Sequence, residues 1–207
     1  GYVLWKYNPS TGDTGVVATN LYPNPQFINI SNKLYYDADH TSTSHYLYEY
    51  DGLTMPKAIH PYNGGGYSQR IGKYKNKIYF TDTADNVCEY DTISKNVVVA
   101  LKNNFPLFTP GGGFVYYNDR MYFSAMDTLN GIELWEWDGT NPPRMAADIY
   151  KGPFSSGASA KLHFTVMPDG VYFVAFSSEQ STGFEVHRYK PFPANVQNLS
   201  FKGEVHA

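Results

Sequence analysis

Carboxylates come nearest to a catalytic pattern in this sequence of 207 residues. Glu49, Glu89 and Glu133 recur in similar aromatic surroundings, and paired carboxylates can act as a general acid and a general base. Glu133 precedes its leucine, however, whereas Glu49 and Glu89 each follow an aliphatic residue by two positions. We therefore interpret all three as polar residues on strand faces, which face solvent or pair across strands. No catalytic residue is predicted, and the chain is not expected to be an enzyme.

A metal site is a second chemistry that the residue types allow. Asp37 and Asp39 are expected in a loop after a strand, where their oxygens and loop carbonyls could hold Ca²⁺. The spacing lacks a twelve-residue acidic loop or an acidic nonapeptide repeat, so isolated acidic residues are the simpler interpretation. The histidines do not fall at metal-binding spacing either: they are His40, His45, His60, His163, His187 and His206. No cofactor other than this candidate Ca²⁺ is expected.

Aromatic residues gather where one group of strands is expected to connect to the next. The rings concerned are Tyr62, Tyr67, Phe105, Phe108 and Phe154. On one interpretation they fill the joints between neighbouring sheets. On the other they form a ligand-binding face, where rings cover the apolar faces of sugars. Both interpretations stay open at this point.

Two features bear on the compartment of the protein. Cys88 is the single cysteine and is expected to be a partly buried free thiol, which excludes an intrachain disulfide. Asn29 and Asn198 each begin an Asn-x-Ser sequon, so they are candidates for glycosylation. Together with the resemblance described below, the sequons favour an extracellular or cell-surface location.

One pattern recurs along the whole length of the chain. It consists of an aliphatic residue, an aromatic or small residue, a polar residue, an aromatic residue and a turn. The copies end at Tyr7, Tyr50, Tyr90, Trp137 and Tyr189. The spacing is roughly 40 to 50 residues, the period of propeller blades. Aspartates in the turns, Asp51, Asp91 and Asp138, are expected to cap the local backbone.

Each copy after the first follows a second aromatic run, such as Lys77-Ile78-Tyr79-Phe80, which is entered through a tight turn. This arrangement predicts hairpins and units of four antiparallel strands. The expected units span residues 24–61, 67–102, 111–150 and 160–201, with a half unit over residues 2–20.

These units predict an all-β fold, a β-propeller of four-stranded antiparallel blades. Four complete repeats and an N-terminal half repeat form one domain over residues 1–207, with five blades expected. The half unit would leave a bare strand edge, which natural proteins avoid. We therefore expect its missing strands to come from sequence outside this chain or from a neighbouring molecule.

A family resemblance is specific over residues 127–160. Gly131-Ile132-Glu133-Leu134-Trp135 runs into Asp138-Gly139-Thr140, and this stretch resembles the ELWxxDGT repeat family. The segment Asp148 to Gly157 is similar to the connector of that family. The resemblance implies a β-propeller in bacterial extracellular or cell-surface proteins, with no settled activity. Ile78 to Asp82 is more weakly similar to YWTD-type propellers, which bind protein ligands.

Composition narrows the function further. The net charge of -3 provides no basic stripe for nucleic acid, and no apolar run approaches the length that a membrane helix needs. We expect a non-catalytic recognition or scaffold module that binds a protein or glycan partner through one loop face. The alternative is a lectin with carbohydrate pockets at the blade joints, and an enzyme with its site in the central channel is the least favoured.

Overall fold

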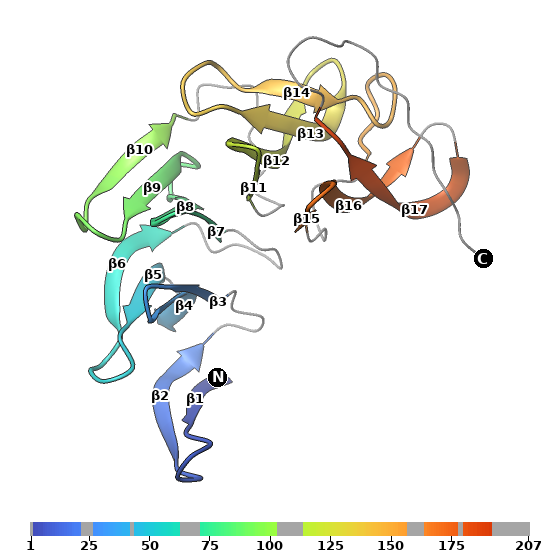
Figure 1. Ribbon diagram of the computed structural model, residues 1–207. Helices are drawn as coiled ribbons and strands as arrows, with labels where there is room; N and C mark the ends of the chain where they lie inside the picture. Colours follow the sequence, from blue (N-terminus) through green and yellow to red (C-terminus); the bar gives the residue numbers. More distant parts are fainter. Residues whose placement is uncertain are drawn as a thin grey trace. The chain divides into compact units, whose positions relative to one another are not determined.

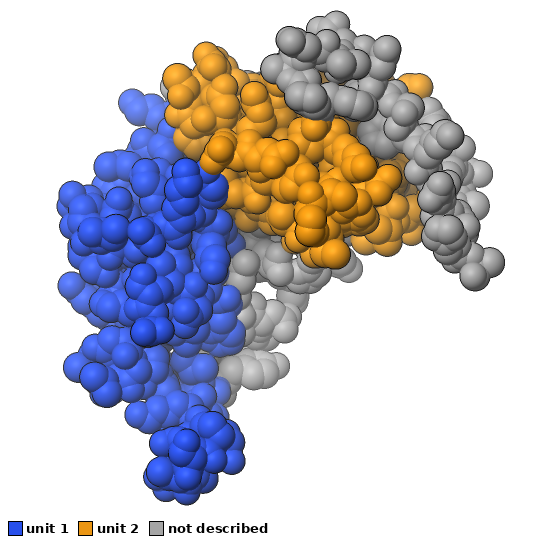
Figure 2. Space-filling view, in the orientation of Figure 1, with its two compact units in different colours: residues 1–103 blue, residues 104–207 orange. Residues whose placement is uncertain are grey.

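The computed structural model describes residues 2–21, 27–41, 44–62, 71–102, 114–156, 164–177 and 180–191. Every regular element in these ranges is a β-strand (Figure 1). Among these residues there is no helix of the length and apolarity that crossing a bilayer requires. The chain divides into two compact units, residues 1–103 and residues 104–207, which Figure 2 colours separately. A single domain over residues 1–207 stays a prediction.

The first unit contains three antiparallel sheets, each built from strands that are consecutive in the sequence. A two-stranded sheet pairs β1 (Tyr2–Tyr7) with β2 (Thr14–Leu21). The next sheet contains β3 (Phe27–Ile30), β4 (Lys33–Thr41), β5 (Ser44–Tyr50) and β6 (Lys57–Tyr62). The third contains β7 (Ile71–Tyr74), β8 (Lys77–Thr81), β9 (Val87–Asp91) and β10 (Val97–Leu101). The predicted two-stranded half unit and the four-stranded design of the next two units are thereby confirmed.

The second unit contains two sheets of the same design. One is formed by β11 (Val115–Tyr117), β12 (Arg120–Asp127), β13 (Gly131–Trp137) and β14 (Arg144–Ala147). The other is formed by β15 (Thr165–Met167), β16 (Gly170–Ser177) and β17 (Gln180–Tyr189). The fourth strand predicted for this last sheet, within residues 196–201, lies outside the described residues.

Tight turns set the registers of the hairpins. Ser31 and Asn32 connect β3 to β4 with φ of 50° and 62°, and Asn118 and Asp119 connect β11 to β12 with φ of 49° and 58°. Two residues with positive φ match the right-handed twist of a hairpin, and Asn and Asp tolerate this conformation better than most residues. The turns read from the sequence are therefore confirmed.

The turn aspartates cap the backbone as predicted. The Asp138 Oδ1 atom accepts hydrogen bonds from the amides of Thr140 and Asn141, at 2.9 and 2.8 Å. A hydrogen bond from the Asn141 side chain, together with these two amide bonds, lowers the pKa of Asp138 to about 2. Asp51 and Asp91 accept the same pair of amide bonds in their own turns.

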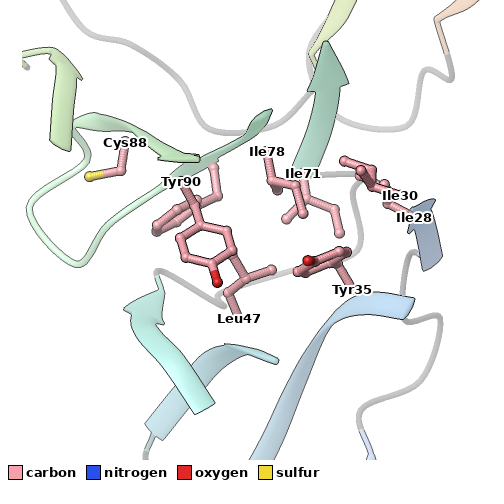
Figure 3. Packing of buried hydrophobic residues seen from close by; sticks show 9 residues of the cluster. Ile28, Ile30, Tyr35, Leu47, Ile71, Ile78, Cys88 and Tyr90 are labelled. Carbon is pink, nitrogen blue, oxygen red and sulfur yellow. The ribbon is translucent and has the colours of Figure 1, made fainter. Parts of the chain in front are cut away.

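The core of the first unit lies between consecutive sheets, as Figure 3 shows. Tyr35 and Leu47 pack there against Ile78, Phe80 and other apolar side chains. Successive residues of a strand point to opposite faces of its sheet, and several residues between these core side chains, such as Tyr36 and Tyr79, are buried as well. Burial of these faces is the main source of stability for sheets of this kind.

The single cysteine belongs to this core. Cys88 is a buried free thiol, and burial raises its pKa to about 12, with the nearby Asp82 carboxylate adding to the effect. A thiol with such a pKa stays protonated and is a poor nucleophile. The structure therefore has the expected free thiol, which is fully rather than partly buried.

The second unit has its own core, which its two sheets form together. Tyr122 and Leu134 of one sheet belong to the same cluster as Val171, Phe173 and Tyr189 of the other. The rings of Tyr122 and Tyr189 contact each other, with centroids 5.5 Å apart. Both units therefore use aromatic strand residues to join one sheet to the next.

Candidate functional site

A glutamate at one repeated strand position forms the same type of polar cluster in three sheets. It pairs across the strands with a tyrosine: Glu49 with Tyr35, Glu89 with Tyr79, and Glu136 with Tyr122. Each glutamate also forms an ion pair with the basic residue that begins the neighbouring strand, namely Lys33, Lys77 or Arg120. The predicted pairing across strands is confirmed for Glu49 and Glu89. Glu136, which sequence reasoning missed, is the true equivalent in the third sheet.

Glu49 has the most extensive of these clusters. Its Oε2 atom accepts hydrogen bonds from Tyr35 Oη at 3.0 Å, Tyr90 Oη at 3.1 Å and Lys95 Nζ at 2.8 Å, and its Oε1 atom pairs with Lys33. Burial acts to raise the pKa of Glu49, but the two lysines and Tyr35 outweigh it and lower the pKa to about 2. This carboxylate is a fixed structural anion and is poorly suited to act as a general base.

The last sheet carries the same cluster with its charges reversed. Arg188 occupies the position of the glutamates, opposite Tyr172. Its Nη1 atom lies 2.9 Å from an Asp169 carboxylate oxygen, and Tyr172 donates a hydrogen bond to the same carboxylate. The position therefore requires a charge pair, and the sign of each member can be exchanged.

Glu133 belongs to a different arrangement, in which it anchors the loop that follows β14. Its side chain is fully buried, with 0% exposure. The carboxylate accepts hydrogen bonds from the amides of Ile149 at 2.8 Å, Tyr150 at 3.3 Å and Ser156 at 3.1 Å. The interpretation of Glu133 as a solvent-facing or cross-strand residue was therefore wrong. Sequence reasoning treated β13 as a strand with one solvent face, but every residue from Glu133 to Trp137 is buried.

The beginning of β13 fits closely against the other end of this loop. Gly131 has φ of +69°, and a Cβ atom there would lie 2.7 Å from the carbonyl oxygen of Phe154. The Ile132 amide donates to Ser155 Oγ at 3.1 Å, and Ser156 Oγ donates to the Ile132 carbonyl at 2.8 Å. We call residues 148–156 the clasped loop, because backbone and side chains of residues 131–133 hold both of its ends.

The clasped loop presents an exposed ring. Phe154 is 62% exposed and contacts Tyr150 edge to face, with ring centroids 5.6 Å apart. Of the five predicted ligand-binding aromatics, Phe154 is the one whose side chain the structure describes. Tyr62 ends strand β6, and nothing is described of its side chain, while Tyr67, Phe105 and Phe108 lie outside the described residues. The clasped loop is therefore the candidate binding site.

We expect Glu133 to make the stability of the second unit depend on pH. Burial raises the pKa of this carboxyl to about 7, although the amide donors act in the opposite direction. Because the folded pKa exceeds the unfolded value, the folded chain binds more protons between about pH 4.5 and pH 7. We expect the unfolding free energy to fall by on the order of 3 kcal/mol as pH rises through this window.

This pH dependence is measured by urea unfolding of the wild type and of Glu133→Gln at pH 4.5, 5.5 and 7. Fluorescence of the buried Trp135 and Trp137 reports on the second unit. The variant has no titrating group at this position, so the unfolding free energy of the wild type minus that of the variant should fall as pH rises. A difference that is constant across the three pH values contradicts the prediction.

Gly131 and Gly139 provide a matched pair of substitutions. Both have positive φ, at +69° and +85°, but an added Cβ meets the Phe154 backbone only at Gly131 and meets nothing within 4 Å at Gly139. We expect Gly139→Ala to cost about 1 kcal/mol from backbone strain, and Gly131→Ala about 3 kcal/mol because the clasped loop must also shift. Urea unfolding measures both values, and equal losses would show that the close approach contributes nothing.

The predicted Ca²⁺ ligands occupy a strand. Asp37 and Asp39 both lie within β4, opposite Leu47 and His45, so their placement in a loop was wrong. Two residues at positions i and i+2 of a strand point to the same face. In the part of the chain that the structure describes, no group of three or more His, Cys, Asp or Glu residues could hold a metal ion. Ca²⁺ binding stays a prediction.

The structure describes one of the two sequons. Asn29 lies in β3 and is exposed, so its side chain is accessible at the surface of the first unit. Asn198 lies outside the described residues. Glycosylation of either residue stays a prediction.

Comparison with solved structures agrees with this architecture. The chain is similar to a protein designated TolB from Agrobacterium tumefaciens, with a TM-score of 0.50 and 12% sequence identity over 92% of this chain and 86% of that one. A protein of unknown function from Bacteroides thetaiotaomicron matches with a TM-score of 0.48 and 14% identity over 81% of this chain, and BamB from Moraxella catarrhalis with 0.40 and 12% over 71%. This chain spans 45% and 38% of the lengths of these two proteins.

These likenesses concern the fold. The sequential four-stranded antiparallel sheets of this chain have the design of propeller blades, and the TolB structure, which matches at a TM-score of 0.50, is a β-propeller. The chain is therefore an all-β protein of the β-propeller class, as the repeats predicted. No protein-family model matches the sequence, and no curated protein matches it either. Membership of the ELWxxDGT family accordingly stays a proposal.

Proposed function

We propose that this chain is a non-catalytic recognition module that binds a protein or glycan partner through the clasped loop. The observation that carries the proposal is the Phe154 ring, which is 62% exposed on a loop that is fixed at both ends. An exposed apolar ring costs free energy in water unless a ligand covers it. A loop that is already ordered loses little entropy on binding, so a single ring can act as an effective anchor.

The charged groups of the described strands support a binding role over catalysis. Glu49 and Glu89 each hold a tyrosine and a lysine in place, Glu136 pairs with Arg120 and Arg144, and Glu133 holds the clasped loop. Catalysis needs a group that can exchange a proton with a substrate at a stated position. These carboxylates are instead engaged with neighbouring side chains and amides of the same unit.

A screen on a glycan array, with and without EDTA, tests the proposal. If a glycan is the ligand, we expect the wild type to bind and Phe154→Ala to bind at least ten-fold more weakly, since a truncated aromatic anchor often costs 2 kcal/mol or more. Leu129→Ala is the control, because Leu129 is another exposed apolar residue of this unit outside the clasped loop. Loss of binding in EDTA would support a metal-assisted site.

A protein ligand requires a second experiment. If the array is negative under both conditions, wild type and Phe154→Ala are used in parallel to capture proteins from the surface of the source organism. A partner that the wild type retains and the variant loses supports recognition by the clasped loop. Equal binding by both proteins, on the array or in the capture, would overturn the assignment of the site to this loop.

The lectin alternative has one specific observation in its favour. Phe154 and Tyr150 form an edge-to-face pair on the clasped loop, and an aromatic surface of this kind can cover the apolar face of a sugar. An extracellular or cell-surface location would suit both versions of the proposal. Secretion of the full-length protein by its source organism, detected in the medium or on intact cells, tests the location.

A further inference from the structure

The hairpin turns of the two four-stranded sheets in the first unit lie at one end of that unit. In a sheet of consecutive antiparallel strands, the first and third turns are at the same end. Across the two sheets, Lys95 Nζ lies 2.8 Å from Glu49 Oε2, and Lys73 Nζ donates a hydrogen bond to the Asn29 carbonyl at 3.2 Å. These contacts bring the turns of both sheets to a common end. We call it the turn end, which comprises residues 31–33, 51–57, 73–77 and 91–96.

Two turns at the turn end carry apolar side chains that are exposed to solvent. Leu53 is 89% exposed and Met55 81% in the turn between β5 and β6, and Ile93 is 73% exposed in the turn between β9 and β10. Leu53 and Ile93 occupy equivalent positions, because each donates its amide hydrogen to the aspartate two residues before it, at 2.8 Å. The capped backbone therefore presents an apolar side chain at the same point of each turn.

Lysines surround these apolar tips and exceed the carboxylates among the described residues of the turn end. They are Lys33, Lys57, Lys73, Lys75, Lys77 and Lys95. The carboxylates near them are Glu49 and Glu89 on the strands and Asp51 and Asp91 in the turns. The lysine side chains of the three ion pairs are 34% to 45% exposed, whereas Glu49 and Glu89 are 12% and 16% exposed. The ammonium groups of these pairs therefore lie outside their carboxylates.

This arrangement fits an anionic lipid surface better than it fits a protein partner. A protein partner is anchored mainly where side chains fill a well-packed pocket. Here the apolar side chains project from the tips of two separate turns (Figure 1). The interface of a bilayer accepts apolar side chains at any spacing, and binding grows with the apolar area buried and with the attraction of basic residues to anionic lipids.

The residue type and the strand directions agree with this choice. A lysine has a long apolar stem, so its ammonium group can stay among the headgroups while a neighbouring apolar tip enters the bilayer. The last strand of each sheet, β6 or β10, runs away from the turn end. The chain therefore continues from the opposite end of both sheets.

We propose that the turn end of the first unit binds the surface of an anionic lipid membrane. Leu53, Met55 and Ile93 enter the membrane at the level of the headgroups, and the surrounding lysines contact lipid phosphates. Binding of this kind is peripheral and leaves every strand outside the bilayer. The turn end belongs to the first unit and the clasped loop to the second, so the proposal does not depend on the proposed function.

Flotation of the full chain with lipid vesicles tests the proposal. The vesicles consist of phosphatidylcholine alone or of equal parts of phosphatidylcholine and the anionic phosphatidylglycerol. We expect at least ten-fold stronger binding to the anionic vesicles, because each lysine near such a surface strengthens binding about five-fold. Binding should fall at least ten-fold between about 0.1 M and about 1 M salt, since the screening length decreases from about 10 Å to about 3 Å. Absence of binding to the anionic vesicles overturns the proposal.

Substitution of the apolar tips tests their part in binding. The double variant Leu53→Ser with Ile93→Ser should bind anionic vesicles at least ten-fold more weakly than the wild type, because less apolar area enters the bilayer. Leu129→Ser is the matched control, since Leu129 is 75% exposed in a turn of the second unit. Circular dichroism establishes that the variants are folded. An equal loss in the control and the double variant overturns the proposal.

Substitution of lysines tests the charge. Lys73→Gln with Lys75→Gln should weaken binding to anionic vesicles by about twenty-fold, from two lysines at about five-fold each. Lys102→Gln should leave it unchanged, because Lys102 is exposed in the first unit outside the turn end. Equal binding to neutral and anionic vesicles contradicts the proposal. So does a concentration-dependent dimer that the Leu53→Ser, Ile93→Ser variant no longer forms, since a second copy then covers the turn end.

Discussion

Replacing Glu133 with alanine is expected to lower the unfolding free energy by about 4 kcal/mol at pH 6. The substitution removes the side-chain acceptor of the Ile149 and Tyr150 amides and one of the two acceptors of the Ser156 amide, which also donates to the Ile132 carbonyl at 3.0 Å. A buried donor left without a partner costs about 1–3 kcal/mol, and water that enters the space left by the side chain reduces the sum. The clasped loop should therefore lose its fixed conformation.

Urea unfolding and amide hydrogen exchange measure this effect together. We expect the amides of Ile149 and Tyr150 to exchange much faster in Glu133→Ala, because local opening of the loop becomes easy. Asp13→Ala is the control, since it also removes one carboxylate but from an exposed turn of the first unit. A loss of stability no larger than in Asp13→Ala would mean that the loop holds its conformation without the glutamate.

Replacing Glu49 with glutamine is expected to cost about 2 kcal/mol at pH 7 and almost nothing at pH 2. Glu49 is the shared acceptor for Tyr35, Tyr90 and Lys95, and its pKa is lowered to about 2. A carboxyl with a lowered folded pKa stabilises the protein above the unfolded value near 4.5, and this stabilisation is lost as pH falls toward 2. The exposed parts of the lysines reduce the effect below the full shift.

Acid titration of stability distinguishes this cluster from general charge repulsion. Wild type, Glu49→Gln and Lys95→Met are unfolded in urea at pH 7, 4.5, 3 and 2. The unfolding free energy of the wild type should fall between pH 7 and pH 2. Most of the fall that Glu49 causes should be absent in Glu49→Gln, and part of it should be absent in Lys95→Met. Lys102→Met should keep the wild-type profile, because Lys102 is exposed outside the cluster. An unchanged acid dependence in Glu49→Gln would exclude Glu49 as its source.

The strands and their order could be predicted from the sequence because their signals are local. Aromatic and β-branched residues at period two, separated by turns such as Ser31-Asn32 and Asn118-Asp119, indicate hairpins without knowledge of distant residues. The capping aspartates are local too, since each accepts hydrogen bonds from amides two and three residues later. The exposed position of Phe154 also agreed with its place in a connection between sheets.

The placements that failed were those that depend on partners far away in the chain. Asp37 and Asp39 extend β4 because β5 continues to pair with them, and nothing in their own neighbourhood marks that length. Glu136 was missed because its equivalence to Glu49 and Glu89 depends on strand register: each of the three lies opposite a tyrosine of the neighbouring strand. A signal was present for Glu133, since Gly131-x-Glu133 recurs as Gly183-x-Glu185, but its meaning lies in the loop that the glutamate holds.

The sequence by itself therefore determined the repeat, the antiparallel strands and the class of fold, because alternation and turn chemistry act over a few residues. The tertiary structure alone decided which carboxylates are buried and what they hold. Burial is the sum of contacts from segments that are distant in the sequence, and the same glutamate is a surface residue or a fully buried anchor according to what covers it. In this protein the sequence suggests that Glu133 is an ordinary strand-face residue, but in the structure it is buried and supports the candidate binding loop.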